Sequence, residues 1–210
     1  MGDGSKHNSI KSNFKSFEIN SDYIFCYNSL KTQVPYQVLD EQYRYVTEYN
    51  VHPYGSNDIS IKLQLKLEQV NRFSSIFFNN KKGKIIFETS NLNIYTKLLN
   101  IDKSNLKTGE ILISDRVQLD HDVLPTDKYS VWSFSSRMDV LLNKLTSNTK
   151  YLILNHVCDI TGEIIDIEKL IPKIRKRFSD IKIIVDGTHY MPHRILNIEK
   201  WDVDLSLIHI

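Results

Sequence analysis

Two segments in the first third of the chain carry apolar residues at every third or fourth position. They cover residues 34–50 and the stretch from Ile59 to about Asn79. This spacing gathers apolar side chains into one stripe along an α-helix. The sequence therefore predicts two helices, separated by the stretch HPYGSND, whose proline, glycine and asparagine favour a loop.

From residue 84 onward, short apolar runs alternate with longer amphipathic stretches, a pattern typical of strands that alternate with helices. Strands joined through helices are parallel, and helices cover both faces of such a sheet. The predicted fold class is therefore α/β, a three-layer, mostly parallel sheet with helices on both faces. The expected strands are KIIFET (84–89), EILISD (110–115), YSVWSFS (129–135), YLILNHV (151–157), KIIVDG (182–187) and VDLSLIHI (203–210). The expected helices are NLNIYTKLLN (91–100), MDVLLNKLT (138–146) and IDIEKLIPKIRKRFSD (165–180).

The composition is that of an ordinary globular protein, with 41% hydrophobic and 25% charged residues and a formal net charge of +2. So small a charge gives no strong attraction to nucleic acid. No apolar run approaches the ~20 residues of a membrane span. We therefore expect neither a nucleic-acid nor a membrane partner. The polar residues 1–20 are expected to form a disordered tail, and residues 21–210 a single domain.

The two cysteines, Cys26 and Cys158, form neither a disulfide framework nor a CxxC motif. They are interpreted as buried thiols of a protein in the reducing cytoplasm.

The stretch IIVDGTHYMPH, Ile183 to His193, is the most informative part of the sequence. A strand of apolar residues runs directly into Asp186, and ligands of parallel sheets bind at the carboxyl ends of strands. A buried carboxylate needs a partner. Asp186 could cap a helix or a turn, could face a cationic atom of a ligand, or could bind a metal together with His189 and His193.

Two further strand ends carry polar residues. In ETSNLNI, Ser90 or Asn91 can cap the following helix, and a helix N-terminus also suits a phosphate. In NHVCDITGE, His156 is either a core histidine or a site residue, and Asp159 follows in the turn before Gly162.

Taken together, these segments resemble the class V aminotransferases, a family of pyridoxal-phosphate enzymes that includes cysteine desulfurases and isopenicillin N epimerase-like proteins. The resemblance runs from about Tyr23 to Ile210. The most specific block runs from YLILNHVCDITGE through IIVDGTH to VDLSLI, and is similar to the family's S-N-x-x-G and V-D-G-A-Q/H motifs. GEILISD and IIFETSNLNI are similar to further family segments. The implied fold is part of the large domain of a fold-type-I pyridoxal-phosphate transferase, with strands in the order 3-2-4-5-6-7-1.

The resemblance implies roles for six residues. Asp186 would face the pyridine nitrogen of pyridoxal 5'-phosphate and keep the ring protonated, as an electron sink requires. His189 would donate a hydrogen bond to the phenolic oxygen of the ring. Both are candidate catalytic residues. Thr89, Ser90 and Asn91 occupy the phosphate-loop positions, and Asp159 matches the family's asparagine.

The sequence also departs from the family at three places. The phosphate loop reads TSNL where the family has S-G-T-T. The pair that supplies the ring-stacking imidazole falls on Gln118 and Leu119, with His121 two residues away. The Schiff-base lysine would fall at residue 212 or, in a shifted register, on Ile210.

We therefore expect a fragment or a degenerate member of the family that is inactive alone, with no metal. The complete family fold implies a dimer and a small amino-acid-like substrate. The alternatives are a non-catalytic binding or interaction module on the same fold, and a metal-binding hydrolase.

Overall fold

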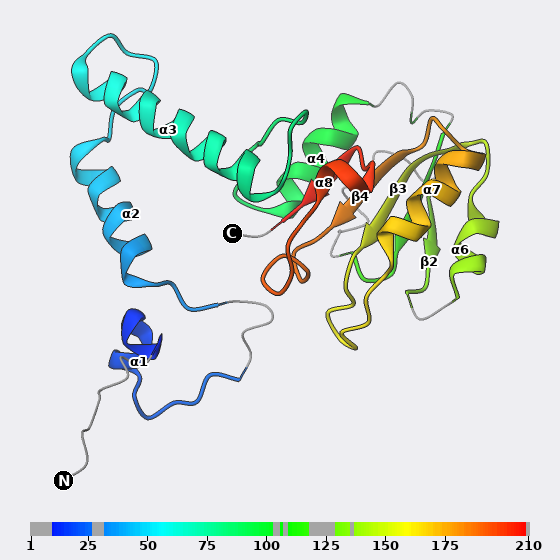
Figure 1. Cartoon of the computed structure of the whole chain (residues 1–210), viewed down its shortest axis with the longest axis horizontal. Helices are drawn as coiled ribbons and strands as arrows, with labels where there is room; N and C mark the ends of the chain where they lie inside the picture. The colour runs from blue at the N-terminus through cyan, green and yellow to red at the C-terminus, as the bar shows by residue number, and fades with distance from the viewer. Residues whose placement is uncertain are drawn as a thin grey trace. The chain divides into compact units, whose positions relative to one another are not determined.

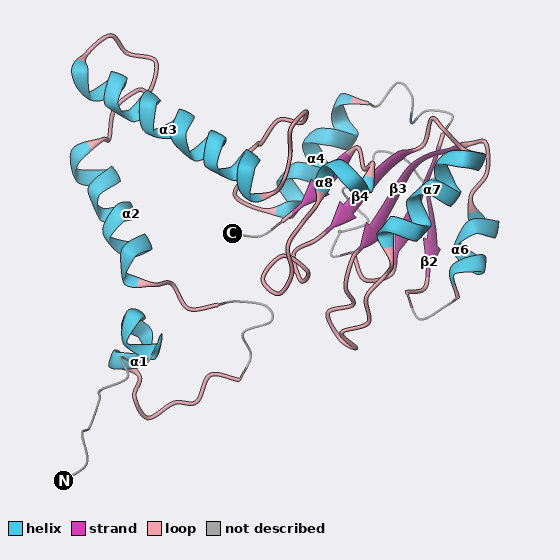
Figure 2. Cartoon of the chain, in the orientation of Figure 1, coloured by secondary structure: helices cyan, strands magenta, loops and turns pink. Residues whose placement is uncertain are grey.

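A computed structural model describes residues 10–26, 32–102, 106, 109–117, 129–134 and 137–208. The chain divides into two compact units, residues 1–71 and 72–210, and the division falls within a long helix. Secondary structure is shown in Figures 1 and 2. Across the described residues, no helix is both long and apolar enough to cross a membrane.

The first unit is helical. Both helices predicted from the apolar spacing are confirmed, and η1 and α1 occupy residues that were expected to be a disordered tail, whose residues 1–9 lie outside the described part. The apolar side chains of α2 are all exposed or half-buried. Cys26, expected to be buried, is exposed, whereas Cys158 of the second unit is buried. The helices are η1 (Ile10–Asn13), α1 (Lys15–Ile19), α2 (Tyr36–Glu48) and α3 (Asp58–Phe77), whose last residues belong to the second unit.

The second unit is built on a five-stranded parallel sheet in the order β2-β1-β3-β4-β5. This is the order 3-2-4-5-6 that the resemblance implied, so the α/β fold class is confirmed. The four-residue helix α8 was missed because it is too short to show a period. The strands are β1 (Glu110–Ser114), β2 (Tyr129–Trp132), β3 (Thr149–Asn155), β4 (Lys182–Asp186) and β5 (Leu205–Leu207). The helices described here are α4 (Asn91–Ile101), α6 (Met138–Lys144), α7 (Ile167–Arg177) and α8 (Ile198–Trp201).

The prediction of a strand at KIIFET is wrong. Residues 84–88 have no regular secondary structure. Ile86 and Phe87 are 72% and 52% exposed. A strand is held by hydrogen bonds to a neighbouring strand, and no strand of the described residues pairs with this segment.

Side chains of each strand alternate between two buried clusters, one on each face of the sheet. Along β4, Ile183 and Val185 pack into the cluster that includes Ile171 and Ile174 of α7. Ile184 packs into the cluster that includes Tyr95 of α4. Helix α4 therefore covers one face and α7 the other.

One arginine ties the end of α7 to the neighbouring strands. The Arg175 guanidinium donates to the carbonyl oxygen of Ile181 at 2.5 Å and to that of Asp202 at 3.0 Å. It also pairs with Asp204 Oδ2 at 2.6 Å, and the same carboxylate accepts the Ile183 amide at 2.9 Å. Asp204 thereby fixes the start of β5 against β4.

Candidate functional site

Asp186 is the last residue of β4, near the middle of the sheet, and His189 lies in the turn that follows. This placement confirms that Asp186 ends a strand of the parallel sheet, as the apolar run before it predicted. The Asp186 side chain is buried, and its Oδ1 accepts the amide of Thr188 at 3.0 Å. One carboxylate oxygen therefore has the turn-forming role that the sequence left open. The other oxygen has no hydrogen bond within the described residues.

Gly187 lets the chain turn closely past β5 after Asp186. Its amide donates to the carbonyl oxygen of Leu207 at 2.7 Å. A Cβ atom at this position would lie 3.3 Å from that oxygen, tighter than most such contacts. A glycine here therefore allows Asp186 to end its strand in contact with the neighbouring one.

The N-terminus of α4 meets the loop after Asp186. Ser90 caps the helix by accepting the Asn93 amide at 3.2 Å, and Thr89 Oγ1 accepts the Asn93 side-chain amide at 2.7 Å. Asn91 Nδ2 lies 3.4 Å from Thr188 Oγ1. The structure thus brings the predicted phosphate-loop residues and the Asp186 loop together, although they are about 95 positions apart in the sequence.

Two buried polar residues beside Asp186 were not predicted as site residues. Asn155 is paired in register with Asp186 across β3 and β4. Tyr95 of α4 is fully buried. Asn155 Oδ1 and the Tyr95 hydroxyl have no hydrogen-bond partner in the described part of the chain. Burial, and then the negative charge of Asp186, raise the pKa of Tyr95 well above its usual value. Tyr95 is therefore a neutral phenol, able to donate a hydrogen bond.

Asp159 lies in the loop that follows β3. Val157 and Ile164 form an antiparallel bridge at the base of this loop, and Gly162 takes a left-handed φ of 72°. Asp159 Oδ1 is buried without a hydrogen-bond partner among the described residues. The loop adds a further acceptor oxygen beyond the carboxyl end of β3.

The alternative that Asp186, His189 and His193 bind a metal gains no support. In the described ranges, no three His, Cys, Asp or Glu side chains gather in a way that could hold a metal ion. His193, the third member of the suggested set, is exposed. Gln118, Leu119 and His121, discussed for the ring-stacking position, lie outside the described residues.

Comparison with known proteins identifies the family. The family model described as "Aminotransferase class-V" matches residues 24–208. The chain belongs to the class V aminotransferase family. Its members, cysteine desulfurases among them, depend on pyridoxal phosphate.

Similar proteins include cysteine desulfurases. A probable cysteine desulfurase of Mycoplasma genitalium is 27% identical over 93% of this chain and 51% of its own length. A putative cysteine desulfurase of Plasmodium berghei is 25% identical over 91% of this chain and 39% of its own length. The chain thus spans about half or less of the length of these curated relatives.

Solved structures share the fold. A NifS-like protein superposes with a TM-score of 0.74 at 15% identity, covering 86% of this chain and 53% of that one. The cysteine desulfurase CsdA from Escherichia coli superposes with a TM-score of 0.66 at 14% identity, covering 94% and 52%. At such low identity these likenesses show the fold alone.

The residues present fit the family's cofactor. The second oxygen of Asp186 has no hydrogen bond in the described part and can accept one from a protonated pyridine nitrogen. The hydroxyls of Thr89 and Ser90 accept bonds from Asn93, and a hydroxyl that accepts one bond still has a proton to donate to a phosphate. These donors lie at the N-terminus of α4, where the helix dipole favours an anion.

Proposed function

We propose that the site at the carboxyl ends of β3 and β4 binds pyridoxal 5'-phosphate. The observation that carries the proposal is the Asn91–Thr188 contact, which joins a helix N-terminus suited to phosphate to the loop of a buried carboxylate suited to a pyridinium. These two features suit the phosphate group and the ring nitrogen of the cofactor.

Each residue of the site has a distinct task in the proposal. Asp186 holds a proton on the ring nitrogen, and His189 donates a hydrogen bond to the phenolic oxygen. Thr89, Ser90 and Asn91 orient the phosphate through their side chains, and Asp159 lines the same end of the sheet. When bound, the cofactor supplies a ring that withdraws electrons from a carbon next to an amine.

We further propose that the whole protein acts on a small amino acid and that its fold is completed as a dimer. Cysteine is the substrate that the names of its relatives suggest. No lysine of this sequence falls at the family's Schiff-base position, so the proposal for the residues described here is cofactor binding rather than turnover.

The test is a titration of the purified chain with pyridoxal phosphate, followed by equilibrium dialysis and by the shift in melting temperature that a ligand of the folded state produces. We expect Asp186→Asn to weaken binding about tenfold or more, because an amide does not hold the ring proton as a carboxylate does. Asp180→Asn is the matched control, since Asp180 is exposed in the turn before β4.

Equal affinities of the two variants would contradict the proposed role of Asp186. Saturable binding that disappears when surface lysines are blocked would mean that only lysine adducts form. If the unaltered chain binds no cofactor at all, the proposal fails and the non-catalytic module becomes the better interpretation.

A further inference from the structure

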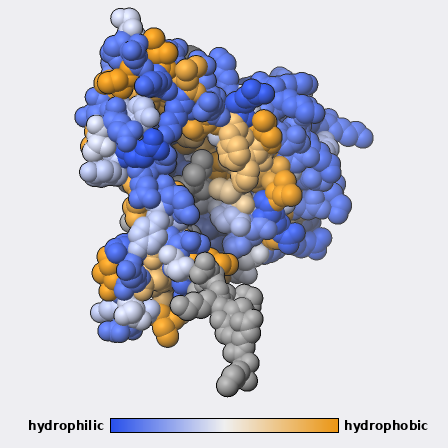
Figure 3. Space-filling model, turned by 60° about the vertical axis from the view of Figure 1, so that its left-hand side comes forward, coloured by the Kyte–Doolittle hydropathy of each residue, from blue (hydrophilic) through white to orange (hydrophobic). Residues whose placement is uncertain are grey.

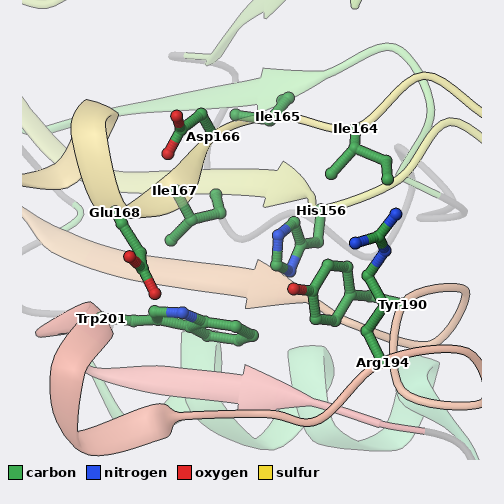
Figure 4. Close-up of a pocket in the computed structure, with 9 residues that line it drawn as sticks. All are labelled: His156, Ile164, Ile165, Asp166, Ile167, Glu168, Tyr190, Arg194 and Trp201. Carbon is green, nitrogen blue, oxygen red and sulfur yellow. The ribbon is translucent and has the colours of Figure 1, made fainter.

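A pocket lies on the α7 face of the sheet, the face opposite to the Asp186 side chain. It has a volume of about 280 Å³ and lies where β3, the N-terminus of α7, the loop after β4 and α8 come together (Figure 4). Six of its lining residues carry polar or aromatic groups, and three isoleucines complete the wall. The six are His156, Asp166, Glu168, Tyr190, Arg194 and Trp201.

His156 is the buried polar group of this pocket. It is 3% exposed, and its imidazole has no hydrogen bond in the described part of the chain. The Tyr190 ring stacks on it with centroids 3.7 Å apart, and Trp201 contacts it edge to face at 4.7 Å. A buried polar atom left unpaired costs about 1–3 kcal/mol. These costs favour a partner for the imidazole other than the side chains that the structure describes.

The imidazole offers an acceptor to such a partner. Burial, and then the positive charge of Arg194, lower the pKa of His156 to about 4. At neutral pH the ring is therefore uncharged, and a neutral imidazole has one nitrogen that accepts a hydrogen bond. Figure 4 shows the ring nitrogens of His156 on the side that faces Glu168 and Trp201, while Arg194 lies on the other side.

Two carboxylates supply negative charge on that same side. Glu168 pairs with Lys200 Nζ at 2.6 Å, and Asp166 pairs with Lys169 Nζ at 2.8 Å. Both pairs are largely exposed, and exposed ion pairs contribute only about 0–1 kcal/mol. The Glu168 carboxylate is therefore available to a cation that enters the pocket, whereas Asp166 also caps α7 by accepting the Lys169 amide at 3.1 Å and contributes its charge. The ring of Trp201 lies below the Glu168 carboxylate and can also attract a cation (Figure 4).

We propose that this pocket binds the ammonium group of a small organic amine, held by Glu168 and the imidazole of His156 over the ring of Trp201. The isoleucine wall receives the alkyl part of the ligand. Asp166 and Glu168 disfavour an anion at their end of the pocket, and Arg194 lies at the other end. This site is independent of the proposed cofactor site, since the two lie on opposite faces of the sheet.

The test uses n-butylamine, n-butanol and butyrate, which have closely similar alkyl chains and differ in charge. Binding is followed by calorimetry and by NMR of the chain labelled with 15N-histidine at pH 7. We expect n-butylamine to bind with a dissociation constant on the order of 1 mM, as suits so small a ligand. It should shift the imidazole nitrogen signals that vanish in His156→Gln, and the alcohol and the carboxylate should bind at least tenfold more weakly.

The matched variants are Glu168→Gln and Glu163→Gln. Glu163 is exposed in the loop after β3 and does not line the pocket. We expect Glu168→Gln to weaken butylamine binding about tenfold and Glu163→Gln to leave it unchanged. The proposal would be overturned if both variants bound butylamine equally or if the three probes bound equally. It would also be overturned if no butylamine bound at concentrations up to 50-fold above the expected dissociation constant.

Discussion

Asn155 and Asp186 lie side by side at the carboxyl ends of β3 and β4, paired in register. The His156 amide, one residue further on, donates to the Asp186 carbonyl at 2.8 Å and closes the ladder there. Both side chains are buried. The end of the sheet thus presents an amide and a carboxylate together on the α4 face. The proposed cofactor site is built around this pair.

The hydroxyl of Tyr95 gives a prediction about stability. It is fully buried and has no hydrogen bond in the described part of the chain. Tyr95→Phe removes a polar atom that costs free energy to bury, so we expect the free energy of unfolding to stay the same or to rise by about 1 kcal/mol. Urea titration of the two proteins measures the change.

Tyr151 serves as the control for that substitution. Its hydroxyl donates to Asp102 Oδ2 at 2.6 Å, and burial, followed by that bond, raises its pKa. Tyr151→Phe removes a hydrogen bond to a charged group and should destabilise by about 1.5–3 kcal/mol. A loss of similar size in Tyr95→Phe would show that the Tyr95 hydroxyl has a partner after all.

The buried imidazole of His156 predicts a pH dependence of stability. Its pKa in the folded chain is about 4, whereas the ordinary value is 6.5. The unfolded chain therefore binds a proton more readily than the folded chain between these values. Stability should be constant above about pH 6.5, fall as the pH drops toward 4, and lose on the order of 2–3 kcal/mol over that range.

Denaturant titrations at half-unit steps of pH would measure this slope. We expect His156→Gln to flatten the curve between pH 6.5 and 4, and the exposed His193→Gln to leave it unchanged. The same slope in the two variants would assign the pH dependence to another group.

Asp204 predicts a loss of stability at lower pH. Burial alone raises the pKa of this carboxyl, but the bonds from Arg175, the Ile183 amide and Lys182 outweigh burial and lower it overall. Its contribution is therefore present above the ordinary carboxyl pKa of about 3.9 and is lost as the pH falls below it. Asp204→Asn should destabilise by about 1–3 kcal/mol at pH 7, since it breaks the pair with Arg175.

The control for Asp204 is again Asp180→Asn, which changes an exposed carboxylate of the same unit and should cost less than about 0.5 kcal/mol. Thermal melts in buffers of pH 7 and pH 3.5 would show a smaller difference between Asp204→Asn and the unaltered chain at the lower pH. A constant difference at both pH values would contradict the assignment.

The apolar runs predicted every strand of the sheet, because strands of a parallel sheet are buried on both faces and need continuous apolar sequence. The same rule failed at KIIFET, since an apolar run becomes a strand only where another strand is available for pairing. Asp186 could be predicted because a carboxylate directly after three apolar residues of a strand is unusual. Tyr95 and Asn155 could not, because within their segments they are ordinary members of a helix stripe and a strand.

The pocket on the α7 face could not be predicted from the sequence either. His156 was left open between a core histidine and a site residue, and its environment comes from Tyr190 and Trp201, more than 30 positions away. Short-range periodicity carries no information about such contacts. Hydrophobic side chains also reach the surface at many points among hydrophilic ones (Figure 3), and no apolar pattern separates these from the buried ones.

The alternation along β3 places the side chains of neighbouring residues on opposite faces of the sheet. Asn155 belongs to the face of Asp186, and His156 to the face of Tyr190 and Trp201. A deletion of one residue within β3 would move both side chains to the wrong face at once and damage both the proposed cofactor site and the pocket beside His156. Lineages of this chain are therefore expected to change these two positions by substitution and not by insertion or deletion, so that the two faces diversify separately while the length of the strand stays fixed.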